Sequence, residues 1–180
     1  VSCLLIQEEM EAFLTESGFK EVDLVVILTW DPTRARWPNQ TKAYPVRDMT
    51  EDDFSRIHEI DRLAFDSIWR QSLANIAAAF QEAASVRVVE LDGKAVGYQI
   101  STVNTQRGHL ARLAVDPIYQ KQGVATSLVG DLLEFFLDKG VVEVSVNTQG
   151  DNQESLKLYQ KFGFLELEDS YPVYQYALKP

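Results

Sequence analysis

The sequence contains few cysteines and histidines and no long apolar run. Each of these shortages excludes a class of structure or site. The single cysteine, Cys3, excludes an internal disulfide and is typical of proteins of the reducing cytosol. With only His58 and His109, the chain shows neither a Cys/His metal cluster nor a Ser-His-Asp pattern. No apolar run approaches the roughly 20 residues that a transmembrane helix needs. We therefore expect a cytoplasmic protein without a metal centre or a membrane span.

Basic residues are also scarce relative to acidic ones. The chain has 17 Lys and Arg against 27 Asp and Glu, which gives a formal net charge of −10 at pH 7. This charge disfavours nucleic acid as a partner and favours cations such as amines, although such acidity is equally typical of soluble proteins in general. A polyanionic ligand would need local positive charge, which Lys121, Lys157 and Lys161 supply.

The chain of 180 residues, 46% of them apolar, is long enough for one packed domain and an appendage. It begins with valine rather than methionine and shows no recognisable signal peptide, which suggests a fragment of a longer protein. The expected division is a helix–strand appendage over residues 1–30, a proline-containing linker over 31–43 and a main domain over 44–180. Within the appendage, we expect a helix over residues 8–17 and a strand over 22–30.

The appendage repeats a pattern found near the end of the chain. In both places a helix ends at Gly-Phe and an apolar strand follows, at Gly18-Phe19 and at Gly163-Phe164. The appendage is therefore either the remnant of a preceding repeat of the same fold or a coincidental use of a common pattern. It lacks the motifs of the main domain, so we assign it no chemistry. A third interpretation is a dimerisation arm, which implies a homodimer.

The main domain alternates helices and strands. Thr50 and Asp53 form a capping box at the start of a helix over residues 54–64, and a second helix is expected to carry Trp69. Asp92-Gly93 predicts a type I′ turn between two strands. The expected strands are residues 44–47, 86–91, 95–102, 110–115, 141–146, 164–168 and 173–178. This order predicts an α/β (α+β) fold with a mixed, twisted central sheet flanked by helices.

One turn is a candidate binding site for pyrophosphate. Gln120-Lys-Gln-Gly123-Val-Ala125 lies between an apolar strand and an amphipathic helix that Gly140 ends. The first N–H groups of such a helix point outward with the positive end of the helix dipole, which suits a bound phosphate. Gly123 lets the backbone approach a ligand closely, and the small Ala125 does not block it. A single glycine at the start of a helix is nevertheless common in α/β proteins.

A second motif follows the next strand. Asn152, Ser155 and Tyr159 are spaced to share one face of a helix that Gly163 ends. Asn152 is also a favourable N-cap. Taken alone, Tyr159 reads as an aromatic side chain packed under the sheet, and only its neighbours favour a functional role.

Together these residues resemble the GNAT superfamily of N-acetyltransferases. The resemblance rests on Val115-Asp-Pro117, on Gln-x-x-Gly-x-Ala at 120–125 and on Asn-x-x-Ser-x-x-x-Tyr at 152–159 followed by Gly163-Phe164. It runs from about Ala43 to the C-terminus, and ribosomal-protein alanine N-acetyltransferases are the most similar members. It implies the GNAT fold and direct transfer, in a ternary complex, of an acetyl group from acetyl-CoA to a primary amine. The amine belongs either to a protein or peptide N-terminus or to a small molecule.

The resemblance also implies how acetyl-CoA binds. In this family, the strand before the pyrophosphate-binding turn, here residues 110–115, separates from the neighbouring strand of the sheet. The free backbone groups of that strand then pair with the pantetheine arm, and the N–H of Val115 becomes the oxyanion donor. Tyr159, whose ordinary pKa near 10 suits a leaving thiolate, is the expected general acid. The expected acetyl-CoA contacts are Leu113, Ala114, Val115, Gln120, Lys121, Gln122, Gly123, Val124, Ala125, Thr126, Asn152, Ser155 and Tyr159.

The resemblance leaves the general base open. The alanine N-acetyltransferases carry a glutamate on the strand before the Asn, and residues 144–147 contain none. Glu143, His109 and a chain of waters are the alternatives. The acceptor site that the family implies lies between the first two helices and the last strands. An aromatic wall with one carboxylate there would suit an ammonium group, although each side chain could equally belong to the core or rim. These residues are Phe65, Asp66, Trp69, Tyr171 and Tyr174.

A noncatalytic acyl-CoA-binding or regulatory module is the alternative function. The missing glutamate and the partial repeat favour this module, whereas Asn152 and Tyr159 favour an enzyme.

Overall fold

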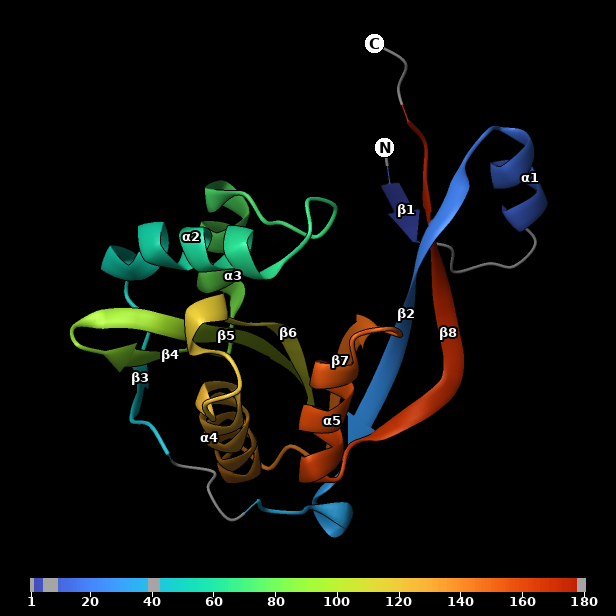
Figure 1. Cartoon of the computed structure of the whole chain (residues 1–180). Helices are drawn as coiled ribbons and strands as arrows, with labels where there is room; N and C mark the ends of the chain where they lie inside the picture. The colour runs from blue at the N-terminus through green and yellow to red at the C-terminus, as the bar shows by residue number, and fades with distance from the viewer. Residues whose placement is uncertain (1, 5–9, 39–42, 178–180) are drawn as a thin grey trace.

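A single eight-stranded sheet lies at the centre of the computed structural model, which describes residues 2–4, 10–38 and 43–177 (Figure 1). The strand order is β1-β8-β2-β7-β6-β5-β4-β3. The strands are β1 (Ser2–Leu4), β2 (Lys20–Trp30), β3 (Val46–Asp48), β4 (Ser85–Leu91), β5 (Lys94–Asn104), β6 (Arg107–Val115), β7 (Glu143–Gln149) and β8 (Leu165–Gln175). The α-helices are α1 (Glu11–Glu16), α2 (Phe54–Ala64), α3 (Leu73–Glu82), α4 (Val124–Asp138) and α5 (Gln153–Phe162). All pairs are antiparallel except β6 with β7.

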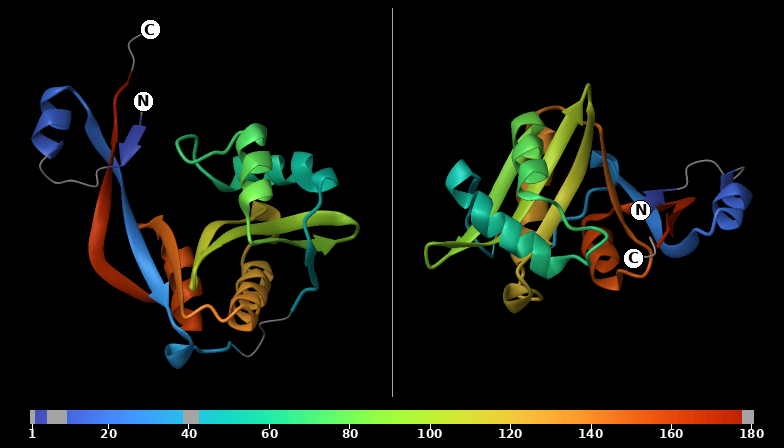
Figure 2. Two further views of the ribbon diagram at one scale, coloured as in Figure 1. Left: turned by 180° about the vertical axis from the view of Figure 1, so that it is seen from behind. Right: turned by 90° about the horizontal axis from the view of Figure 1, so that it is seen from above.

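The helices cover the sheet from both sides. Helices α2 and α3 lie on one face and helices α4 and α5 on the other (Figures 1 and 2). Ile57, Ile60 and Tyr98 form part of the core under the first pair, and Leu132 and Phe136 form part of the core under the second. Among the described residues, no helix is both long and apolar enough to cross a bilayer. The expected α/β fold with a mixed sheet is confirmed.

The local signals of the sequence are confirmed. Thr50 and Asp53 make the predicted capping box, which here closes a short 3-10 turn (Glu51–Asp53) directly before α2. Asp92 and Gly93 have φ angles of 50° and 74°, as a type I′ turn requires. Gly140, at φ 70°, follows the end of α4.

Two expected elements are wrong. The last two predicted strands are a single strand, β8, because β2 pairs with it over most of its length. Residues 167–169 form a bulge between the pairs Val26–Ser170 and Leu28–Glu166, so the strand continues through them. Trp69 does not belong to the second helix. That helix begins at Leu73, because Ser72 caps it by accepting a hydrogen bond from the N–H of Asn75.

The N-terminal elements differ from expectation mainly in where they lie. The first helix is Glu11–Glu16, and the start expected at residues 8–9 falls outside the described residues, as do linker residues 39–42 and strand residue 178. Strand β2 lies between β7 and β8, pairing with β7 from Val25 to Trp30. The sheet therefore runs across the division that the sequence suggests at residue 43.

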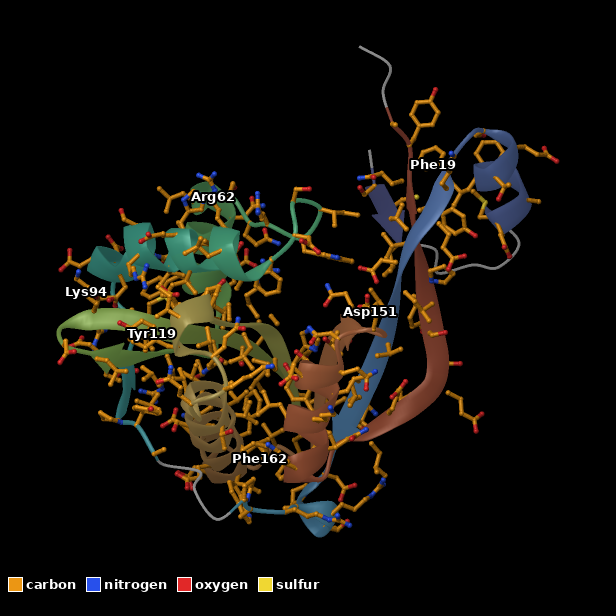
Figure 3. The ribbon with its side chains drawn as sticks, in the orientation of Figure 1. Phe19, Arg62, Lys94, Tyr119, Asp151 and Phe162 are labelled. Carbon is orange, nitrogen blue, oxygen red and sulfur yellow. The ribbon has the colours of Figure 1, made fainter. Side chains whose placement is uncertain are left out.

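The segment after β2 is held against the end of α5. The backbone O of Phe162 accepts hydrogen bonds from Trp30 Nε1 and from Arg36 N, both at 3.0 Å. The ring of Trp37 meets the ring of Phe162 edge-on at 6.4 Å. Phe162 lies at the lower end of α5 in Figure 3. This contact places Pro38 next to α5 at the start of the connection to β3.

Candidate functional site

Strands β6 and β7 separate at one end and open a gap in the sheet. They pair only from Arg107–Glu143 to Leu110–Val146, although β6 continues to Val115 and β7 to Gln149. The register of β6 against β5 shifts between Leu110 and Arg112, so that Ala111 is an unpaired bulge residue. A bulge bends its strand, and the separation begins where this bulge lies.

The backbone of Val115 faces the gap. Asp116 N donates to Val96 O of β5 at 2.9 Å, and alternation along a strand turns the N–H of Val115 the opposite way, toward β7. The side chain of Gln120 donates to Val115 O from the same side, with Nε2 and O separated by 3.1 Å. The gap thus contains a backbone donor where the resemblance expects an oxyanion donor.

The turn after β6 presents the start of α4 to the same gap. Gly123 is the N-cap, with φ 97°, and no side chain of the described residues caps the helix. The N–H groups at the start of α4 are therefore without the side-chain acceptors that usually satisfy them. Asp116 fixes the turn by accepting from Ile118 N at 3.0 Å and by pairing with Arg56 of α2.

A cleft of about 1180 Å³ joins these features and separates α4 from α5. Three lysines, Lys121, Lys157 and Lys161, line it together with one acidic residue, Glu154. Lys121 Nζ lies 3.5 Å from Glu154 Oε1, and both side chains are exposed. The other lining residues are Pro38, Ala64, Phe65, Leu113, Val115, Tyr119, Gln120, Gln122, Gly123, Ala125, Thr126, Asn152, Ser155, Leu158 and Gln160. The cleft is thus locally basic in an acidic protein.

Most of the expected acetyl-CoA contacts line this cleft, and Ala114, Val124 and Tyr159 do not. Ala114 alternates with Leu113 and Val115 along β6, so it faces the core beneath α2. Val124 is buried on the inner side of α4 beside Leu128. The pattern of residue types does not distinguish the two sides of these elements.

Tyr159 lies in the core. Only 4% of its surface is exposed, and its ring centre lies 5.4 Å from that of Phe164. Leu156 and Phe162 occupy the same buried side of α5, whereas Asn152 and Ser155 line the cleft. Burial raises the pKa of the Tyr159 hydroxyl well above its ordinary value. Within the described chain, that hydroxyl has no hydrogen-bond partner, and its role as general acid stays a prediction.

The two candidate bases differ in their distance from the gap. Glu143 stands at the closed end of the β6–β7 pair, roughly 10 Å along the strand from Val146. Its carboxylate lies 3.5 Å from Arg107. His109 is half-buried, one position before the strands separate, with Nδ1 2.9 Å from Ser145 Oγ. Desolvation lowers the pKa of His109, so the ring is neutral at pH 7 and able to accept a proton.

The expected acceptor residues are only partly brought together. Phe65 lines the cleft, and Asp66 O accepts from Trp69 N in the loop after α2. Tyr171 pairs with Val25 across the β2–β8 ladder. Tyr174 is directed to the other face of β8, where its hydroxyl is 3.3 Å from Glu11 of α1.

A buried polar cluster beside the gap was not predicted. The carboxylate of Asp61 is fully buried, and it accepts from Tyr98 Oη at 2.6 Å and from Arg112 Nε at 2.8 Å. The guanidinium of Arg112 also lies 3.6 Å from the ring centre of Phe65. A signal was present, because Asp61 occupies the apolar stripe of its helix next to Ile57 and Ile60.

Two proteins named as N-acetyltransferases match this chain in sequence. The chain is 27% identical over 124 residues to the putative [ribosomal protein bS18]-alanine N-acetyltransferase of Bacillus subtilis, which covers 69% of this chain and 82% of that protein. It is 33% identical over 70 residues to N-alpha-acetyltransferase 30 of Schizosaccharomyces pombe, which covers 39% of this chain. That second match spans only 47% of the yeast protein.

Solved structures share the fold. A GCN5-related N-acetyltransferase from Sphaerobacter thermophilus superposes with a TM-score of 0.73 at 14% identity, covering 97% of this chain and 58% of that one. The PaiA N-acetyltransferase of Thermoplasma acidophilum, solved in complex with coenzyme A, gives a TM-score of 0.63 at 14% identity, covering 73% and 97%. The family model of the acetyltransferase (GNAT) family matches residues 43–164, and the chain belongs to that family.

Proposed function

We propose that the chain transfers the acetyl group of acetyl-CoA to a primary amine, and that the α-amine of a protein N-terminus is the first acceptor to test. The observation that carries the proposal is the continuity of the cleft. It connects the uncapped start of α4 with the gap between β6 and β7, where Val115 is one of the lining residues. The names of both sequence relatives point to protein N-termini as acceptors.

The residues of the cleft fit acetyl-CoA. The N–H groups at the start of α4 lack capping side chains and suit a pyrophosphate. Lys121, Lys157 and Lys161 supply positive charge for further phosphate oxygens. Alternation along β6 turns the N–H groups of Leu113 and Val115 away from β5, where they would bind the pantetheine arm. When bound, acetyl-CoA supplies an activated acyl group as a thioester.

The chain's own residues would serve the transfer in three ways. The N–H of Val115 would stabilise negative charge that develops on the acyl oxygen, because it is a fixed donor aimed into the gap. Tyr159 would provide the proton for the departing thiolate. His109, neutral and next to the gap, would accept the proton of the amine through intervening water.

Calorimetry with acetyl-CoA and with free CoA is the first experiment, followed by mass spectrometry of peptides that begin with alanine and of small amines. The proposal expects binding of both ligands and a mass gain of one acetyl group on the α-amine of the peptide. Binding without any acetyl transfer would instead indicate a noncatalytic acyl-CoA-binding module. Absence of binding would overturn the assignment of the cleft.

A further inference from the structure

The loop between α2 and α3, residues 65–72, reaches toward β2 (Figures 1 and 2). Its base is anchored to the buried Asp61 cluster. Gln71 N donates to Asp61 Oδ1 at 2.8 Å, and Arg112 of β6 donates from its guanidinium to Trp69 O at 2.7 Å. Because Asp61 is fully buried, this attachment is protected from competition by water.

The far side of the loop has a second attachment, to a different strand. Trp69 Nε1 donates to Asp23 Oδ2 of β2 at 2.9 Å. The other carboxylate oxygen of Asp23 accepts from Leu24 N at 2.8 Å, which fixes the orientation of the carboxylate. A bulge between Glu21 and Asp23 precedes this contact, and bulges commonly re-aim the side chains that follow them.

These two attachments place Trp69 across the gap. Arg112 belongs to β6 and Asp23 to β2, and β7 lies between those strands in the sheet. The last pair of β2 with β7 on this side is Val25–Gln149, so Asp23 lies beyond it, at the end of the sheet where β6 and β7 separate. Residues 65–72 therefore span the open end of the gap.

The loop spans the gap on the face opposite α4 and α5. Its base is held by Asp61 of α2, and α2 covers that opposite face. The proposed acyl donor occupies the cleft between α4 and α5. An amine that attacks through the gap must then arrive from the face where the loop lies, and Trp69 lies beside its path.

We propose that Asp23 is a positioning residue for the acceptor: by holding Trp69 across the gap, it shapes the site that an incoming amine, such as a peptide N-terminus, must enter. The inference rests on the proposed function. It gives β2 a role in the reaction although β2 contributes no residue to the cleft. The Asp61 cluster anchors the loop to α2 and β6. Among the hydrogen bonds of the described residues, only the one to Asp23 connects the loop to β2.

The test compares Asp23→Ala, Asp23→Asn, Trp69→Phe and Glu21→Ala with the wild-type chain. Trp69→Phe removes the indole donor while keeping an aromatic ring. Asp23→Asn keeps one acceptor oxygen and should lie closer to the wild type. Glu21→Ala is the matched control, because it removes a carboxylate from the same strand that makes no hydrogen bond within the described chain. The readouts are hydrogen–deuterium exchange of residues 65–72, the KM for a peptide beginning with alanine, kcat, and the Kd of acetyl-CoA.

We expect exchange in residues 65–72 to become at least fivefold faster in Asp23→Ala and Trp69→Phe. We expect the peptide KM to rise about five- to tenfold, with kcat and the acetyl-CoA Kd within twofold of the wild type. Glu21→Ala should match the wild type in all four readouts. Unchanged exchange would show that Asp23 does not hold the loop, and faster exchange with an unchanged KM would remove its role toward the acceptor. A wild type that acetylates no amine would overturn the proposed function instead, and with it the acceptor role, while the exchange data still report on the attachment.

Discussion

Replacing Gly123 by alanine tests two separate properties of this position: its effect on the free energy of unfolding and its effect on the binding of acetyl-CoA. A Cβ at Gly123 would meet the Cβ of Ala43 at 3.7 Å and the ring of Tyr44 at 3.8 Å, which are ordinary contacts, so no clash is expected. The φ of 97° is left-handed, and an L-residue there costs about 1–2 kcal/mol. We therefore expect Gly123→Ala to fold with its free energy of unfolding lowered by about that amount.

Gly140→Ala is the matched control for this variant. Gly140 has φ 70°, a methyl group there would meet no atom within 4 Å, and the residue lies at the other end of α4. Urea unfolding should therefore show similar losses of stability in both variants.

Binding should differ between the two variants. If the backbone of Gly123 relaxes, the N–H groups at the start of α4 shift, and the loss of one charge-assisted hydrogen bond costs about 1.5–3 kcal/mol. Calorimetry should then give a Kd for acetyl-CoA about ten- to a hundredfold higher in Gly123→Ala. Gly140→Ala should bind like the wild type. Equal affinity in the two variants would refute the assignment of the pyrophosphate to this turn.

Three further predictions concern the core around the gap. Asp61→Asn should lower the free energy of unfolding by about 3–5 kcal/mol in urea titrations, because Arg112 loses its charged partner; a wild-type midpoint would contradict this. Tyr159→Phe should lower turnover tenfold or more with the acetyl-CoA Kd unchanged, and equal turnover would remove Tyr159 from catalysis. Because desolvation lowers the pKa of His109 from its ordinary 6.5, the unfolded chain binds the proton first, so stability should fall as pH drops below about 6.5. His109→Gln should weaken this pH dependence, and an unchanged dependence would assign it to other groups.

The sequence was sufficient wherever a few neighbouring residues decide the structure. The Thr50 capping box, the Asp92-Gly93 turn, the helix start at Gly123 and the N-cap Asn152 all form as predicted. Each depends on hydrogen bonds or backbone angles within about four positions of the chain. The cleft was predictable for the same reason, because one of its walls is the turn that ends at Gly123 and the other is the helix that Asn152 caps.

The sequence was insufficient where distant segments decide the structure. The pattern of β2 predicts a strand but carries no information that its partners are β7 and β8. The helical spacing of Tyr159 with Asn152 was correct, yet tertiary packing turned the ring toward Phe164. Trp69 looked like a helical residue, and its actual position depends on Asp23, which lies on another strand.

The position of β2 has a consequence for how the protein is made. Val25 pairs with Gln149 and Thr29 with Leu165, so β2 is synthesised more than a hundred residues before either of its partners. Pairings this distant slow folding, because a long loop must close before any contact forms. Until β8 has left the ribosome, the edge of β2 that pairs with it stays open, and unpaired strand edges promote aggregation. We therefore expect production of this protein in cells to depend on chaperones more than its small size would imply.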